Sequence, residues 1–233
     1  MVRAIFFLLL FVPFTLFIIC TGVPVTFLDP TGRFLHNYGK FWGRFSLFLA
    51  GSKVRVAGLE KIPAGVPVIF MGNHQSNFDI LSLYAGLPRH FSWIAKEELF
   101  RIPLFGYAMK RAGYLPLDRS DGRRALKTME SAAEKIRGGV SVVIFPEGTR
   151  TMDGKLLPFK RGGFLLAARA GVPIVPFTVN GSARVNPAKR LEVHPGTITI
   201  NFGDPIPTEG ATGRKRDDLI YRVMEAIEKG LEA

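Results

Sequence analysis

The chain has 233 residues, enough for one large α/β domain with little left for a second. Hydrophobic residues make up 47% of it, so a substantial core can form even after a membrane segment is set aside. The formal net charge of +12 favours an anionic partner, such as a phosphorylated substrate, an acidic lipid headgroup or nucleic acid. Because Cys20 is the only cysteine, a disulfide framework and a thiolate metal site are excluded, and the compartment is expected to be reducing.

The first stretch of the chain has the composition of a membrane segment. No charged residue lies between Arg3 and Asp29. At about 1.5 Å per residue, a helix over this run could cross a hydrocarbon core of about 30 Å, although Pro13 and Pro24 interrupt it. Three interpretations are open: a cleaved signal peptide, for which the sequence near Cys20 has poor cleavage spacing, a single span, or the first helix of a membrane-bound pair.

The next stretch favours the pair of helices. Aromatic residues recur there at helical spacing while the cations fall elsewhere: Phe34, Tyr38, Phe41, Phe45 and Phe48 against Arg33, Lys40 and Arg44. This pattern is typical of a helix lying in the membrane interface, although an aromatic stripe buried in a core has the same spacing. Cations cluster after the apolar run, which places the main domain on the cytoplasmic face, of the inner membrane if the protein is bacterial. We therefore expect membrane-associated helices over residues 1–52 and one main domain over residues 53–233.

From Lys53 onward, short strands alternate with helices. The predicted strands are Val54 to Ala57, Val68 to Met71, Phe91 to Ala95, Tyr114 to Leu117, Val140 to Phe145, Ile174 to Val179, Glu192 to His194 and Thr197 to Phe202. The predicted helices are Ile80 to Leu87, Leu104 to Arg111, Arg123 to Arg137, Gly163 to Ala170 and Asp217 to Lys229. Because several strands are rich in β-branched residues and are separated by helices, we expect an α/β fold with a mostly parallel or mixed sheet covered on both faces.

Polar residues follow four of the predicted strands at the points where these strands end. His74 and Asp79 follow the second strand, Lys96 the third, Arg119 the fourth and residues 146–150 the fifth. In an open α/β sheet, ligands bind outside the carboxyl ends of the strands. If these strands run parallel, a base, its carboxylate and three cations share one edge, which suits an anion beside a proton acceptor.

His74 and Asp79 have the spacing of a base and the group that orients it. Five residues is a poor spacing for one helix face, so the pair requires a bend, which Asn73, Ser76 and Asn77 favour. A strand, a bend and a helix would let Asp79 hold one tautomer of the imidazole and leave the other nitrogen free to accept a proton. The alternative for a lone histidine is a surface position or a structural position in the core.

The segment Pro146-Glu147-Gly148-Thr149-Arg150 admits two interpretations. It could merely end a strand with a turn. Gly148 and Thr149 also offer backbone and hydroxyl donors beside the Arg150 guanidinium, a combination suited to phosphate. The sequence has no Gly-x-Ser-x-Gly elbow, no phosphate-loop motif and no two-histidine metal spacing. Direct acyl transfer to a phosphorylated lipid alcohol, without a protein nucleophile, fits what remains.

Four blocks resemble the motifs of the glycerolipid acyltransferases, in the family's order. They are Asn73-His74-Gln75-Ser76-Asn77-Phe78-Asp79, the block from Lys96 to Gly106, Phe145-Pro146-Glu147-Gly148-Thr149-Arg150, and Val172-Pro173-Ile174-Val175-Pro176. The resemblance spans residues 73–176 and is strongest to the acyltransferases that convert lysophosphatidic acid to phosphatidic acid. The departures are mild: Thr151 stands where Ser is common, and Phe177 stands where Val is frequent.

The resemblance identifies the main domain, residues 53–233, as an acyltransferase domain and implies both a reaction and the residues that perform it. His74 deprotonates the sn-2 hydroxyl of 1-acyl-glycerol 3-phosphate, and Asp79 orients His74. The implied substrate-binding residues are Lys96, Arg119, Glu147, Gly148, Thr149 and Arg150. Acyl-CoA or acyl-carrier protein donates the acyl chain, lysophosphatidic acid in the membrane accepts it, and neither a metal nor a further cofactor takes part. The resemblance also implies an amphipathic helix pair immersed in one leaflet.

Rival functions remain open at this stage. The acceptor could instead be glycerol 3-phosphate, another lysophospholipid or a lyso-aminolipid. A protein that binds anionic lipid at the membrane surface without turning it over explains the charge equally well, but it leaves His74 and Asp79 without a task. Nucleic acid is not expected as a partner, because residues 53–233 lack aromatic residues interleaved with cations.

Overall fold

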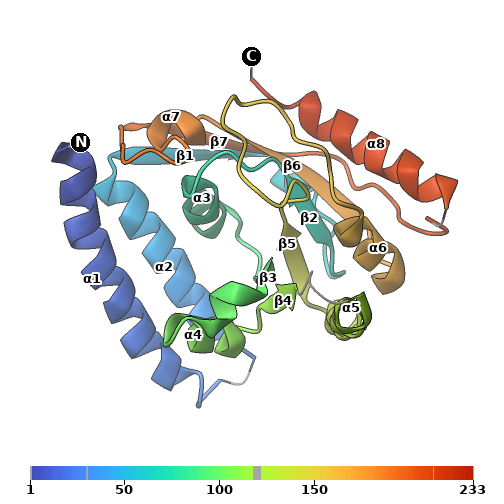
Figure 1. The fold of residues 1–233 in the computed structure, drawn as a ribbon, viewed down its shortest axis with the longest axis horizontal. Helices are drawn as coiled ribbons and strands as arrows, with labels where there is room; N and C mark the ends of the chain where they lie inside the picture. The colour runs from blue at the N-terminus through green and yellow to red at the C-terminus, as the bar shows by residue number, and fades with distance from the viewer. Residues whose placement is uncertain (1, 30, 118–121, 212, 233) are drawn as a thin grey trace.

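The computed structural model describes residues 2–29, 31–117, 122–211 and 213–232, with the backbone alone for residues 117 and 122–127. Within these residues, seven strands form one sheet that carries helices on both faces (Figure 1). The strands are β1 (Ser52–Ala57), β2 (Ile69–Gly72), β3 (Phe91–Lys96), β4 (Leu115–Leu117), β5 (Ser141–Ile144), β6 (Ile174–Asn180) and β7 (Gly196–Phe202). The predicted α/β fold is confirmed.

The sheet is mixed, in the order β1-β7-β6-β2-β5-β3-β4. The five strands from β6 to β4 run parallel to one another, whereas β7 is antiparallel to β6 and parallel to β1. Every residue of β2, β5 and β6 is buried. Runs of this kind are expected for strands that are covered on both faces. The carboxyl ends of β2, β3 and β5 therefore meet at one edge, as the sequence predicted.

Two helical layers enclose two cores. One face of the sheet carries α1 (Val2–Val25), α2 (Arg33–Leu49), α3 (Phe78–Gly86), α4 (Phe105–Arg111) and α7 (Ser182–Val185), and the other carries α5 (Gly122–Arg137), α6 (Arg161–Ala170) and α8 (Arg214–Glu228) (Figure 1). Short 3₁₀ turns, η1 (Leu59–Lys61) and η2 (Glu97–Arg101), complete the described elements. Along β2, Phe70 enters the first core, whereas Ile69 and Met71 enter the second, because side chains alternate across a strand.

One predicted strand is wrong. Residues 192–194 form a loop, although their sequence has the pattern of a strand. The His194 backbone N–H donates to the Val185 carbonyl oxygen at 2.8 Å, and the Glu192 carbonyl oxygen accepts from the Asn186 side chain at 2.8 Å. These backbone groups therefore form hydrogen bonds with the segment around α7 and not with a neighbouring strand. The short helix α7 itself was not predicted from the sequence.

The N-terminal helices α1 and α2 lie side by side (Figure 1). Among the described residues, α1 is the one helix long and apolar enough to cross a membrane, and Pro13 and Pro24 lie inside it without ending it. The aromatic stripe of α2 divides: Phe45 packs on Phe14 with ring centroids 4.4 Å apart, whereas Phe41 and Phe48 are exposed. Since α2 ends at Leu49 and β1 begins at Ser52, the predicted division between residues 52 and 53 falls near this junction and stays a prediction.

Candidate active site

The chain leaves the sheet at the carboxyl end of β2, the central strand. Asn73 makes the exit possible: its side-chain amide donates to the Val179 carbonyl oxygen at 2.9 Å, and its amide oxygen accepts from the Val179 N–H at 2.7 Å. The side chain thus occupies the place of a neighbouring backbone beside β6. Gly72 is required just before, because a Cβ at this position would lie 2.3 Å from the Phe177 ring.

The turn that follows brings His74 and Asp79 into contact. Asp79 is fully buried, and its Oδ2 accepts hydrogen bonds from His74 Nδ1 at 2.7 Å and from the backbone N–H groups of Gln75 and Ser76 at 2.8 and 2.9 Å. An ionised carboxylate only accepts, so Nδ1 carries the proton and Nε2 is free to accept one. The imidazole also stacks on Phe145, with ring centroids 4.0 Å apart. This is the geometry that a base and its orienting group require, and the catalytic roles themselves stay a prediction.

Glu147 lies behind this pair. Its side chain is buried, and its two carboxylate oxygens accept from the backbone N–H groups of His74 at 2.8 Å and Leu157 at 2.9 Å. Burial raises the pKa of the carboxyl group, while the two backbone N–H groups counter this shift by stabilising the anion. A third bond ties the same loops, because the Thr151 N–H donates to the His74 carbonyl oxygen at 2.9 Å. Glu147 therefore braces the backbone that carries His74.

A cavity of about 550 Å³ opens beside His74. Its polar end is lined by His74, Lys96, Gly148, Thr149 and Arg150. The structure thus brings together five of the eight residues predicted for the site, with Asp79 directly behind His74. Glu147 is not among the lining residues, and Arg119 lies outside the described residues, so its role stays a prediction.

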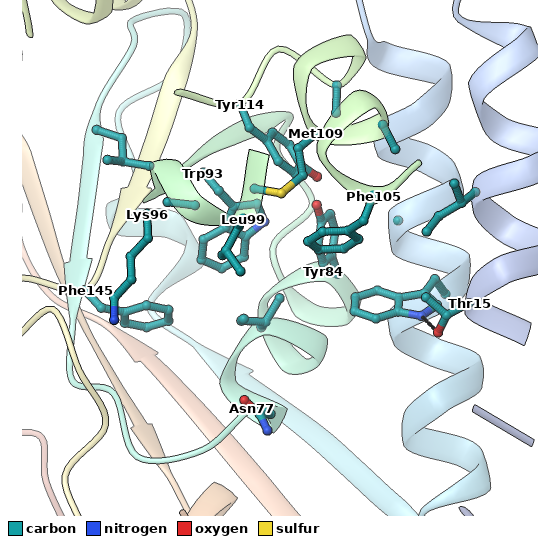
Figure 2. Close-up of a pocket in the computed structure, with 18 of the residues that line it drawn as sticks. Thr15, Asn77, Tyr84, Trp93, Lys96, Leu99, Phe105, Met109, Tyr114 and Phe145 are labelled. Carbon is teal, nitrogen blue, oxygen red and sulfur yellow. Dashed lines mark hydrogen bonds between the residues drawn. The ribbon is translucent and has the colours of Figure 1, made fainter. Parts of the chain in front are cut away.

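The remainder of the cavity is mostly apolar and runs toward the N-terminal helices. Figure 2 shows Lys96 and Phe145 at one side and Thr15 at the other, with Tyr84, Trp93, Leu99, Phe105 and Met109 between them. At the far side, Trp42 Nε1 donates to Thr15 Oγ1 at 2.9 Å, which satisfies both polar groups. Sequence reasoning missed this wall, because no motif marks residues of α1 and α2 that meet the cavity only through packing.

These features define what the site can do. His74 lies at the boundary between a mouth that carries Lys96 and Arg150 and an apolar cavity of about 550 Å³, which is large enough to hold hydrocarbon. In the part of the chain that the structure describes, no three His, Cys, Asp or Glu residues lie close enough together to hold a metal ion. The arrangement suits proton removal from an alcohol that carries both an anionic group and a long apolar chain.

Comparison with known proteins identifies the family. Residues 53–180 match the acyltransferase family model. The chain belongs to the acyltransferase family. The match covers the strands, turns and helix that carry His74, Asp79, Lys96 and residues 147–150 of this acyltransferase.

Curated relatives carry one shared name. This acyltransferase is 36% identical, over 223 residues, to a chloroplast 1-acyl-sn-glycerol-3-phosphate acyltransferase of Arabidopsis thaliana, a match that covers 94% of this chain and 61% of the relative. It is 34% identical to the 1-acyl-sn-glycerol-3-phosphate acyltransferase of Pseudomonas aeruginosa over 186 residues, covering 78% and 71% of the two chains. Against three chloroplast and algal relatives, the chain spans about half to three fifths of their length.

A solved structure extends the likeness to the N-terminal helices. The crystal structure of the 1-acyl-sn-glycerophosphate acyltransferase PlsC from Thermotoga maritima matches this acyltransferase with a TM-score of 0.82 at 26% identity. The match covers 98% of this chain and 96% of that chain, so the helices before residue 53 are included in the shared fold.

Proposed function

We propose that this acyltransferase moves a fatty acyl chain from acyl-CoA or acyl-carrier protein to the sn-2 hydroxyl of 1-acyl-glycerol 3-phosphate, forming phosphatidic acid. The observation that carries the proposal is the His74–Asp79 pair at the junction between a cationic mouth and an apolar cavity of about 550 Å³. The names of the relatives agree with this substrate. The reaction belongs to phospholipid biosynthesis and takes place at the membrane, on its cytoplasmic face.

The proposed chemistry is a direct transfer in one ternary complex. His74 Nε2 accepts the hydroxyl proton as the oxygen attacks the thioester carbonyl carbon, and Asp79 stabilises the imidazolium that forms. The tetrahedral intermediate collapses by breaking the carbon–sulfur bond, and the imidazolium returns the proton to the departing thiolate. Atoms and charge balance without a protein nucleophile or a metal ion.

The two ends of the cavity bind different parts of the acceptor. Lys96 and Arg150 supply positive charge for the acceptor phosphate, and a guanidinium pairs well with phosphate oxygens. The apolar remainder of the cavity, formed partly by α1 and α2, takes hydrocarbon. The exposed apolar side chains of α1, among them Phe6, Leu9 and Phe17, support a location of these helices in the lipid.

Purified protein in detergent, incubated with labelled palmitoyl-CoA and lysophosphatidic acid, tests the reaction. His74→Ala should lower turnover by about 10² to 10⁴, the usual contribution of a general base. His194→Ala is the matched control, because this histidine is exposed and does not line the cavity. Turnover that survives in His74→Ala contradicts the base assignment.

The same assay separates the remaining alternatives for the substrate. If wild-type protein is silent with this pair, acyl-carrier protein as donor and a panel of glycerol 3-phosphate, other lysophospholipids and lyso-aminolipids follow. Product with another acceptor would retain the mechanism and change the substrate. No product across the panel would contradict catalysis and favour an anionic-lipid-binding protein.

A further inference from the structure

A short segment beside the cavity exposes several large apolar side chains to the surface of the protein. Five large apolar side chains within residues 99–107 are between 37% and 58% exposed: Leu99, Ile102, Leu104, Phe105 and Tyr107. These five residues are referred to as the η2–α4 lip. Single exposed apolar residues are normal on a protein surface, but a contiguous group of this size marks an interaction site.

The backbone of the lip is strained in a way that presents Leu104 outward. Leu104 has φ 61° and ψ −54°, and the Phe105 N–H donates to the Pro103 carbonyl oxygen at 2.6 Å. This is a γ-turn of the positive-φ type, which is rare and strained for a residue with a side chain. Strain of this kind persists where function requires the shape. Leu104 is also the most exposed side chain of the lip, so burial of this side chain does not compensate for the strain of the turn.

The lip is also the outer wall of the cavity. Leu99 and Phe105 line the cavity and are 37% and 38% exposed in total, while Ile102 and Leu104, which do not line it, are exposed beside them. Apolar surface therefore continues from the interior of the cavity to the exterior of the protein at this wall. A molecule that contacts both the interior and the exterior of this wall must itself be apolar.

The exterior of the lip is joined to the end of the N-terminal hairpin. From α4, Arg111 donates to the Thr26 side chain at 2.8 Å and to the Thr26 carbonyl oxygen at 2.6 Å, and its guanidinium lies 4.8 Å from the Phe27 ring centroid. Phe27 and Leu28 are 66% and 85% exposed. Figure 1 shows α4 beside the connection between α1 and α2. The lip thus extends the exposed apolar surface of α1.

Cations flank the lip on the sequence. Lys96 and Arg101 precede its turn, and Lys110 follows it on α4, all three with exposed side chains. An apolar tip flanked by long basic side chains is typical of segments that enter a bilayer surface, where the cations reach the headgroups. Glu97 and Glu98 lie in the same stretch, and Glu97 pairs with Arg101 at 3.3 Å. From residue 96 to residue 111 four cations still outnumber these two carboxylates, so the net positive charge of the segment fits an anionic lipid surface.

We propose that the η2–α4 lip enters the hydrocarbon of the bilayer as a second membrane contact beside the α1–α2 hairpin. Lipid chains then cover its apolar surface. The inference rests on the proposed function only in placing the enzyme at a membrane. Because the lip is the cavity wall, acyl chains pass between the bilayer and the cavity at this side without crossing water.

A fluorescent probe reports directly on the position of the lip. In a Cys20→Ser background, Ile102→Cys and Tyr221→Cys are each labelled with an environment-sensitive dye and mixed with vesicles of phosphatidylcholine and phosphatidylglycerol. Tyr221 is the matched control, since it is 60% exposed but lies on α8, on the other face of the sheet. We expect a blue shift, and quenching by lipids brominated on their chains, at position 102 alone. A probe at 102 that stays in water, or responds as at 221, overturns the proposal.

An activity measurement separates the lip from the catalytic machinery. Gly accepts a positive φ without strain, so Ile102→Ser with Leu104→Gly removes apolar surface while relaxing the turn. The loss of two inserted side chains should lower the rate on long-chain lysophosphatidic acid in vesicles by about tenfold or more. The rate on a short-chain acceptor dissolved as monomers should stay unchanged.

The two substrates also keep the proposals distinguishable. An equal loss on both, or no loss on vesicles, overturns the membrane role of the lip. Wild-type protein that is silent on both substrates contradicts the proposed reaction, while the probe experiment still tests the lip by itself.

Discussion

The two sides of the cavity are held together by different interactions. At the polar end, Asp79 and Glu147 are buried, and each accepts hydrogen bonds from two backbone N–H groups, so the loop that carries His74 is fixed. On the helical side, His36 of α2 is buried behind the residues that line the cavity, and neither of its ring nitrogens has a hydrogen-bond partner among the described residues. Hydrogen bonds fix the positions of the side chains at the polar end, whereas apolar packing holds the helical side in place.

The difference predicts separate phenotypes for the two sides. Changes at the polar end should alter turnover with little effect on the packing of the helices. Changes at buried positions of α1 and α2 that do not line the cavity should alter stability with little effect on turnover. Three substitutions test this division.

The largest effect is expected from Asp79→Asn. The amide oxygen still accepts from the backbone, but an amide cannot hold the tautomer or stabilise the imidazolium as a carboxylate does. We expect kcat to fall by about 10² to 10⁴. Asp204→Asn is the control, since that side chain is 82% exposed in its ion pair with Lys61. A kcat within a few-fold of wild type would show that the pair is structural.

Glu147→Gln should have a smaller effect on the same end. The amide oxygen can accept one backbone N–H, but the amide nitrogen then faces the other N–H, leaving a buried donor without an acceptor. An unsatisfied buried group costs about 1 to 3 kcal/mol, so displacement of His74 should lower kcat by about 10 to 100-fold with the acceptor KM unchanged.

The opposite kinetic result would restore the assignment that the family resemblance implies. If Glu147→Gln raises the acceptor KM and leaves kcat intact, Glu147 acts on the acceptor and does not brace the loop. Glu130→Gln provides the control, because Glu130 is exposed in ion pairs with Arg137 and Arg169.

The smallest effect is expected in the wall. Burial, assisted by the nearby positive charges of His90 and Lys40, lowers the pKa of His36 from 6.5 to about 3. The folded state therefore binds fewer protons than the unfolded state, so this part of the stability is present above pH 6.5 and is lost as the pH falls toward 3. Between pH 7.0 and 5.5 the loss is about 1 kcal/mol for one such group.

His36→Phe removes this titration while keeping an aromatic ring beside Tyr84 and Phe91. Thermal unfolding of the detergent-solubilised protein at the two pH values should then show a smaller acid destabilisation than wild type, and turnover at pH 7.0 should be retained. His194→Phe, at an exposed position, should not change the pH dependence. Equal acid sensitivity in wild type and His36→Phe would mean that His36 is not the group responsible.

The same division explains how much of the molecule could be predicted from the sequence. The contact between His74 and Asp79 depends on a turn of five residues, so local sequence contains it. The shared edge for Lys96 and Arg150 follows from the rule that parallel strands end together. The hydrogen-bond partners of Glu147 are the backbone N–H groups of His74 and Leu157, which lie 73 and 10 residues away in the sequence. A glutamate in this motif does not indicate which backbone groups it will contact.

Three features could not be predicted from the sequence. Nothing in the sequence around Leu104 signals a positive φ, since such positions favour Gly or Asn. The pattern of residues 192–194 fits a strand, but their backbone groups bond to the segment around α7. The helical wall depends on contacts between α1, α2 and the cavity that only the packed chain reveals. For residues 192–194 and for the helical wall, long-range contacts override local preference.

The bonds between Asn73 and Val179 bear on the order of events during synthesis. A ribosome makes the α1–α2 hairpin first and the His74 turn soon after, whereas the strand that steadies Asn73 follows 106 residues later. Until β6 emerges, the nascent chain lacks the partner that shapes the loop carrying His74. We therefore expect the His74 turn to take its final shape only after β6 (residues 174–180) has been translated.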